Sequence, residues 1–320
     1  MKKTLILTVL ITITGVLRAQ FSPQVSHFMY DQLRTNPGSA GNTEMICVNG
    51  IIRDQLNSFT GAPKTYLVEV DAPFKLFGLQ HGVGVYIYQD AIGFFTNTDF
   101  ALTYAYRWSL GNGTLGIGAQ AGFVKNDLKL TNGGWITSDG NDVPTTDQNI
   151  PQGSPNKTKI HFAAGLFYKT EDIYFGISSV NINNPEIQDA SSPSGAKYKI
   201  NRQYYVTAGY TMQMKNPIYE LKPAILLKSD GVTTDMDINL TLLYNKSIWT
   251  GVTYRTGEAV VGMLGLELTR LVPGLKVGIS YDFLTSSLSK DLETYEILLS
   301  YSFKIGVEKA PQKYKSIRFL

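Results

Sequence analysis

Strict alternation of apolar and polar side chains is the feature that most constrains the fold of this chain. In residues 98–109, one face holds Phe100, Leu102, Tyr104, Tyr106 and Trp108, and the residues between them are small or polar. Successive side chains of a strand point to opposite faces, so this period of two predicts a strand with one apolar side. Residues 115–123 and 275–281 repeat the pattern, which indicates an all-β protein.

The same pattern, read along the chain, predicts about fourteen strands with boundaries uncertain by a few residues. The expected ranges are 43–53, 64–73, 81–89, 96–109, 113–125, 159–169, 173–180, 203–214, 219–228, 236–244, 247–254, 258–268, 275–282 and 293–303.

Two architectures fit such strands, a soluble β-sandwich and a transmembrane barrel. Many of the strands approach the roughly 9–11 residues that a tilted membrane strand needs. Trp108 and Tyr281 stand at strand ends, where aromatic girdles lie in membrane barrels. The second face is rich in Gly, Ser and Thr, which suits a polar lumen. The strand number is even, as single-chain bacterial barrels require. We therefore expect residues 43–303 to form a transmembrane antiparallel outer-membrane β-barrel.

The connections between these strands alternate in length. Residues 110–112, 170–172, 215–218 and 245–246 are short turns, whereas 126–158 and 181–202 are long, and the first of these is dense in turn-forming residues. In outer-membrane barrels the short turns face the periplasm and the long loops face outward. This predicts extracellular long loops and two periplasmic termini.

The first nineteen residues have the order of a secretory signal peptide, with Lys2 and Lys3, an apolar run from Leu5 to Leu17, and a cleavage site after Ala19. A membrane-anchoring helix is the alternative, but the run is shorter than the roughly 20 residues of a bilayer span. Cleavage leaves equal numbers of basic and acidic residues, so neither charge nor address suggests nucleic acid.

Residues 20–42 and 304–320 fall outside the expected strands. Ser22 can cap a helix, Pro23 fits its first position, and Asn36-Pro37-Gly38 would end it. We expect a short periplasmic helix that plugs the barrel mouth, or an arm packed on the rim. Residues 304–320 form a basic tail that would also lie in the periplasm.

No catalytic or cofactor constellation stands out. The glycine pairs at 82 and 84 and at 116 and 118 precede no helix, so they are interpreted as barrel glycines that permit close packing rather than phosphate loops. His27, His81 and His161 lack metal-ligand spacing. Asp235 and Asp237 are expected to face water. We expect a protein that is not an enzyme and holds no cofactor.

Several motifs resemble the PorP/SprF family. The segments Gln24 to Tyr30 and Asn36 to Gly41 are similar to its N-terminal signature, and Arg53 to Gln55 with residues 61–65 is similar to its next block. Residues 81–93 and the end at Arg318-Phe319-Leu320 also resemble it. The chain departs from the family at Leu56, where an aromatic residue is expected, so no role is given to that position.

The resemblance implies an outer-membrane component of the type IX secretion or gliding machinery. Such members help to export or retain large surface adhesins with a C-terminal sorting domain, and relatives associate with a periplasmic peptidoglycan-binding lipoprotein. Outer-membrane lipid surrounds them. The alternative function is a channel for a small or hydrophobic solute. The residues expected to dock partners are Phe28, Tyr30, Asn36, Pro37, Gly41, Arg53, Gln55, Arg318, Phe319 and Leu320.

Overall fold

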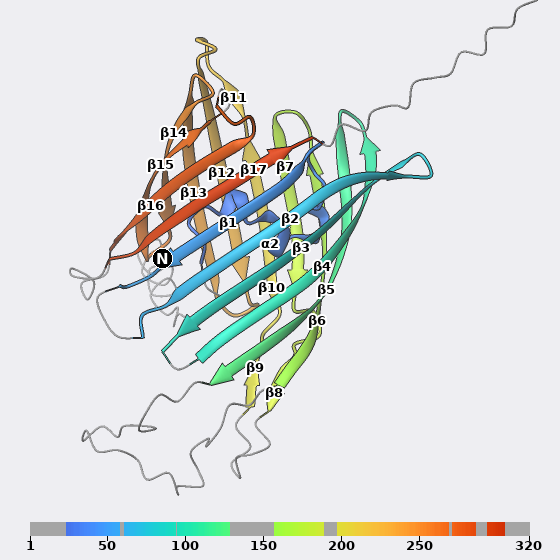
Figure 1. The fold of residues 1–320 in the computed structure, drawn as a ribbon, viewed down its shortest axis with the longest axis vertical. Coiled ribbons are helices and arrows are strands. Elements are labelled where there is room, and N and C mark those ends of the chain that lie inside the picture. Colours follow the sequence, from blue (N-terminus) through green and yellow to red (C-terminus); the bar gives the residue numbers. More distant parts are fainter. Residues whose placement is uncertain are drawn as a thin grey trace, which may run out of the picture.

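A computed structural model describes residues 24–57, 61–93, 95–128, 157–188, 197–268, 271–285 and 293–304. Tilted strands surround a lumen that holds a short helical segment (Figure 1). Among these residues, no helix is long and apolar enough to cross a membrane. The predicted signal peptide and almost all of the basic tail lie outside the described residues.

Three short helical turns precede the strands: η1 (Phe28–Tyr30), α2 (Gln32–Thr35) and η2 (Pro37–Ser39). The strands are β1 (Ile46–Asp54), β2 (Lys64–Leu76), β3 (Leu79–Ile92), β4 (Phe95–Leu110), β5 (Gly113–Leu128), β6 (Lys157–Lys169), β7 (Ile173–Val180), β8 (Glu186–Gln188), β9 (Lys197–Lys199), β10 (Gln203–Tyr210), β11 (Met212–Gln213), β12 (Tyr219–Ser229), β13 (Thr234–Tyr244), β14 (Ile248–Arg255), β15 (Ala259–Glu267), β16 (Leu275–Leu284) and β17 (Tyr295–Phe303).

The strands form a closed antiparallel ring. Each pairs with its neighbours in the chain, β10 pairs with β12 across the short β11, and β1 pairs with β17 to join the two ends. Within the described residues the ring has fourteen strands, because β11 continues β10 and because β8 and β9 form a separate hairpin. The predicted fold and strand number are confirmed, and each of the fourteen ranges overlaps one observed strand.

The two faces of the wall have opposite character. On β4, Leu102 is 60% exposed on the outside, whereas the neighbouring Thr103 is 4% exposed and faces the lumen. Large apolar side chains occupy the outer positions of nearly every strand, and small, polar or charged ones occupy the inner positions. This is the sidedness of a barrel whose exterior contacts lipid and whose interior is polar.

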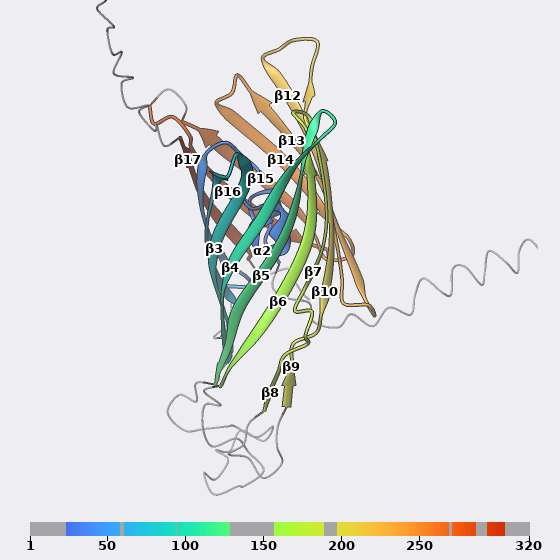
Figure 2. The ribbon, with the colours of Figure 1, turned by 90° about the vertical axis from the view of Figure 1, so that its right-hand side faces the viewer.

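The two ends of the barrel differ. We name the "long-link end" as the one where β5, β6, β7 and β10 meet the links 129–156 and 181–202, and the "β17 end" as the one where β1 begins and β17 ends. The hairpin of β8 and β9 projects beyond the ring at the long-link end (Figure 2). The link 181–202 was expected to be a long loop, yet it contains this hairpin.

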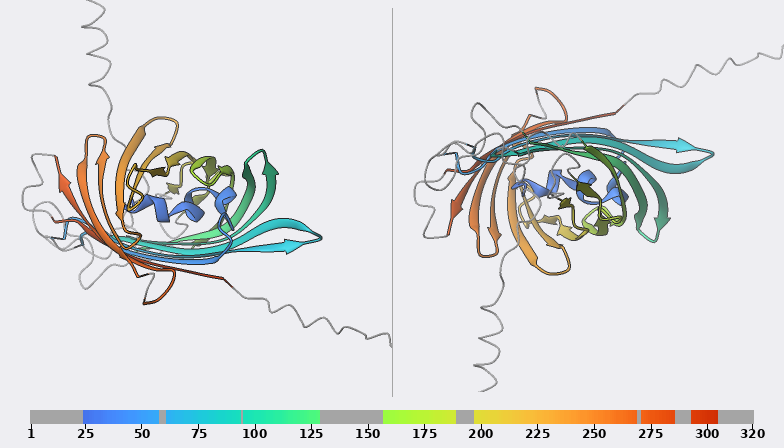
Figure 3. Two further views of the ribbon diagram at one scale, coloured as in Figure 1. Left: turned by 90° about the horizontal axis from the view of Figure 1, so that it is seen from above. Right: turned by 90° about the horizontal axis from the view of Figure 1, so that it is seen from below.

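Residues 24–42, the plug segment, lie inside the lumen (Figure 3), and their contacts extend from the long-link end to the β17 end. Gln24 donates to Asp235 near the long-link end, and Gly41 packs on Gly82 near the β17 end. The segment therefore lies within the barrel and reaches from one mouth to the other. The start of the plug segment lies opposite the end of β17.

One continuous helix over residues 23–35 was wrong. Asp31 leaves the helical region with ψ of 48°, and it separates η1 from α2. Wall side chains donate to backbone carbonyls on both sides of this break. Asn49 donates to the Tyr30 carbonyl at 3.1 Å, and Ser178 donates to that of Thr35 at 2.6 Å. The first bond replaces a helical one, and the second satisfies a carbonyl at the end of α2 that has no partner within the helix.

Candidate functional site in the lumen

A row of wall glycines forms a seat for the plug segment at the β17 end. A Cβ on Gly118 would lie 2.2 Å from the Pro37 carbonyl carbon, and one on Gly116 would lie 2.0 Å from the Gly38 oxygen. On β6, a Cβ on Gly165 would meet the Asn36 side chain at 2.1 Å. No side chain fits between these backbones, which is the reason for glycine at these positions.

Polar groups fix the same part of the plug segment. The Asn36 amide oxygen accepts from Gly38 N at 2.9 Å, and its amide nitrogen donates to the Leu166 carbonyl at 3.0 Å. Asn36 therefore caps η2 and ties it to β6. Asp71 accepts from Gly41 N at 2.8 Å. We call this region, with residues 36–41 on the glycines of β3, β5, β6 and β7, the glycine seat.

An ion pair lies in the middle of the plug segment. The Arg34 guanidinium binds the Asp31 carboxylate with two hydrogen bonds, one from Nε at 2.9 Å. The same guanidinium stacks 4.8 Å from the centre of the Tyr88 ring on the wall. This pair balances the two charges within the segment, and the ring contact joins Arg34 to the wall.

At the long-link end, the plug segment is held by carboxylates of the wall. The backbone nitrogens of Ser26 and His27 each donate to Glu296 at 2.8 Å, and His27 Nδ1 lies 2.7 Å from the same carboxylate. Ser26 Oγ donates to Asp282 at 3.0 Å. Both carboxylates are fully buried.

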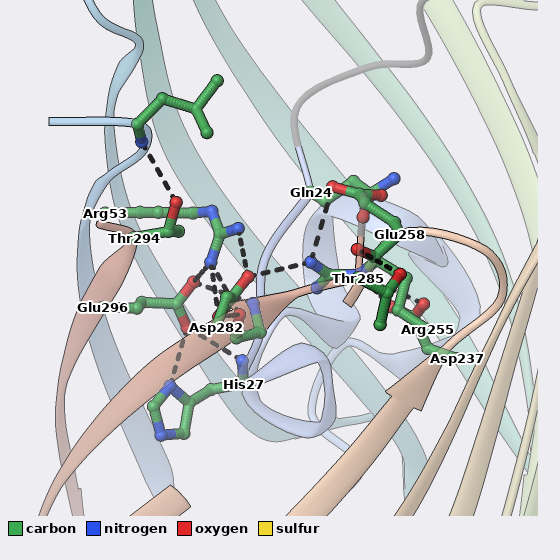
Figure 4. Close-up of polar contacts among 12 residues, drawn as sticks. Gln24, His27, Arg53, Asp237, Arg255, Glu258, Asp282, Thr285, Thr294 and Glu296 are labelled. Atoms are coloured by element: carbon green, nitrogen blue, oxygen red, sulfur yellow. Dashed lines mark hydrogen bonds and ion pairs between the residues drawn. The ribbon is translucent and has the colours of Figure 1, made fainter. Parts of the chain in front are cut away.

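Two arginines complete this cluster (Figure 4). Arg53 binds Asp282 at 2.7 Å and Glu296 at 3.5 Å, and Arg255 binds Asp282 at 3.0 Å and Asp237 at 3.3 Å. Buried charges are tolerated only when they are paired and hydrogen-bonded, and here each has at least one partner. We call Ser26, His27, Arg53, Asp237, Arg255, Asp282 and Glu296 the ionic anchor.

A half-open pocket of about 130 Å³ lies beside the plug segment at the β17 end. Met29 and Tyr30 of the plug segment form one side of it. The other sides come from the ends of β7, β10 and β12–β16. The wall residues that line it include Tyr174, Tyr210, Lys222, Ala224, Trp249 and Lys276.

Most of the residues expected to dock partners lie inside the lumen. Phe28, Asn36 and Pro37 are buried in the plug segment, and Arg53 belongs to the ionic anchor. Gly41 lies in the glycine seat, and Tyr30 lines the pocket. In this structure these six hold the plug segment or border the space beside it. Docking through them stays a prediction, and it requires that the segment leave the lumen.

The remaining docking candidates lie elsewhere. Gln55 follows β1 at the long-link rim, where its backbone nitrogen donates to the Pro63 carbonyl at 2.9 Å. Arg318, Phe319 and Leu320 lie outside the described residues, so docking through them also stays a prediction.

Sequence reasoning missed four members of the ionic anchor: Asp237, Arg255, Asp282 and Glu296. Asp235 and Asp237 were expected to face water, which is wrong, because they are 8% and 2% exposed and point into the lumen. Part of this cluster could have been predicted from the sequence. Charged residues at inner positions near one end of several strands, with both signs present, predict an ion-pair cluster once the ring is assembled.

The profile of the family described as "Type IX secretion system membrane protein PorP/SprF" matches residues 17–301. No curated protein matches the sequence significantly.

Similar solved structures are outer-membrane barrels of low sequence identity. The toluene transporter TodX of Pseudomonas putida has 10% identity and a TM-score of 0.48, over 89% of this chain and 95% of that one. The toluene transporter TbuX of Ralstonia pickettii has 10% identity and a TM-score of 0.48, over 85% and 93%. The outer membrane protein Omp33 of Acinetobacter baumannii has 9% identity and a TM-score of 0.45, over 83% and 100%.

Proposed function

Because the chain belongs to the PorP/SprF family of type IX secretion system membrane proteins, we propose that it supports export or surface retention of large adhesins through protein contacts. The family assignment makes it an outer-membrane component of that system. The partners that we propose are other secretion components, a periplasmic peptidoglycan-binding lipoprotein, and adhesins with a C-terminal sorting domain. The family is described as one of secretion membrane proteins, and we propose no catalytic role.

The observation that carries this proposal is the occupied lumen. The plug segment is attached at both ends and is buried or half-buried along its length, which supports a barrel that acts as a scaffold. A solute channel, the alternative, would need a continuous path past residues 24–42.

Pull-down from membranes tests the proposal. The full chain with an affinity tag in the link 129–156 is solubilised in mild detergent, and bound proteins are identified. We expect secretion components among the bound proteins. A deletion strain should lose adhesins from its surface while its uptake of small solutes stays unchanged. Recovery of lipid alone, together with a solute-specific uptake defect, would favour the channel.

We further propose that the long-link end faces outward and that the β17 end faces the periplasm. The length and polarity of the two long links support this orientation. A cysteine at Ser192 should react with an impermeant thiol reagent on intact cells, whereas one at Asn245, in the turn after β13, should not. The native Cys47 is buried and gives a low background. The reverse labelling would contradict the orientation.

We also propose that the basic tail, residues 304–320, docks partners at the β17 end. A chain without residues 305–320 keeps the complete β17, so insertion is expected to be normal while adhesin display falls. Normal display by a truncated barrel that inserts fully would remove the tail from the docking proposal.

A further inference from the structure

The hairpin of β2 and β3 reaches farther than its neighbour β1 at the β17 end. The ladder between β1 and β2 stops at the pair of Cys47 and Asp71, whereas β2 continues to Leu76. In both views of Figure 3 this hairpin, coloured cyan, leans out past the ring of strands. We name its residues 72–81 the projecting tip. Among the described residues, the tip has no strand on its β1 side.

The projecting tip is apolar on the face that continues the outside of the wall. Leu76 and Leu79 pair with each other on the same side of the hairpin as the outward-facing Val83, and they are 46% and 50% exposed. Lys75 and Gln80 occupy the opposite, inner side, because side chains alternate along each strand. The lipid-facing surface of the barrel therefore extends onto the tip.

Aromatic residues of the neighbouring strand β4 indicate the level of the tip relative to a membrane. The ladder of β3 and β4 reaches the pair of Gln80 and Arg107, so Leu79 lies next to Trp108. Trp108 and Tyr104 are 51% and 46% exposed on the outer face. Tryptophan and tyrosine are enriched where a membrane meets water. The tip is therefore at the level of a membrane interface.

The turn of the tip carries a bulky residue in an unfavourable backbone conformation. Phe77 and Gly78 have φ of 51° and 80°, as in the two-residue turn that usually contains Asn-Gly. In the turn after β13, Asn245 has the same φ of 51°. Bulky residues rarely adopt this region, and residues held there cluster at functional sites. Phe77 is 93% exposed, so packing within the described chain does not account for it.

We propose that the projecting tip anchors the barrel in phospholipid, with Leu76, Phe77 and Leu79 in the membrane interface at the β17 end. Lys75 and Gln80 stay on the water side. The occupant is lipid because the apolar face of the tip is continuous with the lipid-facing wall and ends beside an aromatic girdle residue. Burial of apolar surface drives the contact. This anchor goes beyond the proposed role in secretion and does not depend on it.

Fluorescent labels on the two faces of β2 test the proposal. In a Cys47→Ser background, Leu76→Cys and Lys75→Cys each carry a bimane label. The full chain is placed in nanodiscs of phosphatidylcholine with or without a nitroxide on the acyl chains, and both membrane faces stay open to iodide. We expect nitroxide lipid to quench the label at position 76 more strongly, and iodide to quench the label at position 75 more strongly. A label at Asn245→Cys, in the polar turn after β13, gives the water-exposed reference.

Two substitutions of Phe77 separate anchoring from folding. Phe77→Leu keeps an apolar side chain and should keep the label at position 76 shielded from iodide. Phe77→Asn suits the positive φ better, so the protein should be at least as resistant to urea. Loss of one apolar side chain from the interface should nevertheless shift the tip about 10-fold toward water, which appears as stronger iodide quenching at position 76.

Equal iodide quenching at positions 75 and 76, without an effect of nitroxide lipid at either position, would overturn the proposal and leave the tip as a water-exposed surface for a protein partner. Iodide quenching at position 76 that stays unchanged in the Phe77→Asn variant would also contradict it, because Phe77 would then not hold the tip in lipid. Neither result bears on the proposed function, which the pull-down tests separately.

Discussion

The glycine seat and the ionic anchor hold opposite ends of one segment by opposite means. The seat works because the wall glycines have no side chains, so that the backbone of residues 36–41 lies directly on the backbone of β3, β5 and β6. The anchor works because charged groups are present, and the wall carboxylates of Asp282 and Glu296 bind the backbone and side chains of Ser26 and His27. One attachment depends on shape and the other on charge balance.

This difference determines which changes each attachment tolerates. A seat of glycines fails when any side chain is added, whereas polar substitutions nearby leave it intact. An anchor of buried ions fails when one member is removed, because the partners left behind are desolvated charges.

The largest effect is expected from Arg53→Met. The substitution keeps most of the side-chain volume but leaves Asp282 and Glu296 without their shared cation. Loss of one partner from a buried ion pair costs about 3–5 kcal/mol, so the free energy of unfolding should fall by that amount. Urea titration of the protein refolded into detergent micelles measures it.

Lys64→Met is the matched control at the same end of the barrel. Lys64 pairs with Asp54 at 3.4 Å, but 52% of its side chain is exposed. Exposed ion pairs contribute about 0–1 kcal/mol, so the control should change little. Equal losses in the two variants would contradict the distinction between a buried anchor and a surface pair.

A smaller loss is expected from Gly118→Ala in the seat. The new Cβ would lie 2.2 Å from the Pro37 carbonyl carbon, and both atoms belong to rigid backbone segments. Overpacking of this kind costs about 3 kcal/mol, and it should release residues 36–41 to added protease before the barrel unfolds. Gly50→Ala on β1 has its nearest atom at 3.8 Å and should remain resistant. If Gly118→Ala resists the protease as well as Gly50→Ala does, the added Cβ does not displace residues 36–41, and close packing is not what holds them.

His27→Phe separates hydrogen bonding from ring packing within the anchor. His27 Nδ1 lies 2.7 Å from Glu296, and the ring meets Trp249 edge-on at 5.7 Å between centres. Phenylalanine keeps the ring contact, and Glu296 keeps Arg53 and two backbone donors. The loss should therefore be about 1 kcal/mol by urea titration. A loss as large as that of Arg53→Met would mean that His27 carries most of the anchor.

The smallest effect is expected outside the lumen, in the turn between β12 and β13. The backbone nitrogens of Thr233 and Val232 donate to Asp230 at 2.8 and 2.9 Å and hold the pKa of this carboxyl below its ordinary value. A pKa lowered on folding adds stability above the unfolded value and loses it as pH falls through the folded one. Asp230→Asn should reduce stability slightly at pH 7 and not at pH 3. A deficit that persists at pH 3 would exclude this charge effect.

The barrel was largely predictable from sequence because each strand carries its own evidence. Alternation in residues 98–109 is local, and it identified both β4 and its outer face before any partner strand was known. Turn residues such as Gly111 and Asn245 have positive φ and end strands within a few positions of the expected boundaries.

The lumen was not predictable in the same way because its contacts join distant parts of the chain. His27 meets Glu296 at a separation of 269 residues, and Asn36 meets Leu166 at a separation of 130. The glycines of β5 were correctly interpreted as packing positions, but nothing in the strand itself says that a segment from the N-terminal side lies on them. Helix-forming signals in residues 22–35 were overridden by wall groups such as Asn49 and Ser178.

The position of the ionic anchor links it to the biogenesis of the ring. Arg53 on β1 and Glu296 on β17 are direct neighbours across the seam that joins the first and last strands. Until β17 docks, the first residues of the plug segment lack Glu296 and Arg53 lacks one of its two carboxylates. If the ring closes without the segment, Glu296 keeps Arg53 but loses three donors. Closure of the barrel and enclosure of its N-terminal segment therefore stabilise each other.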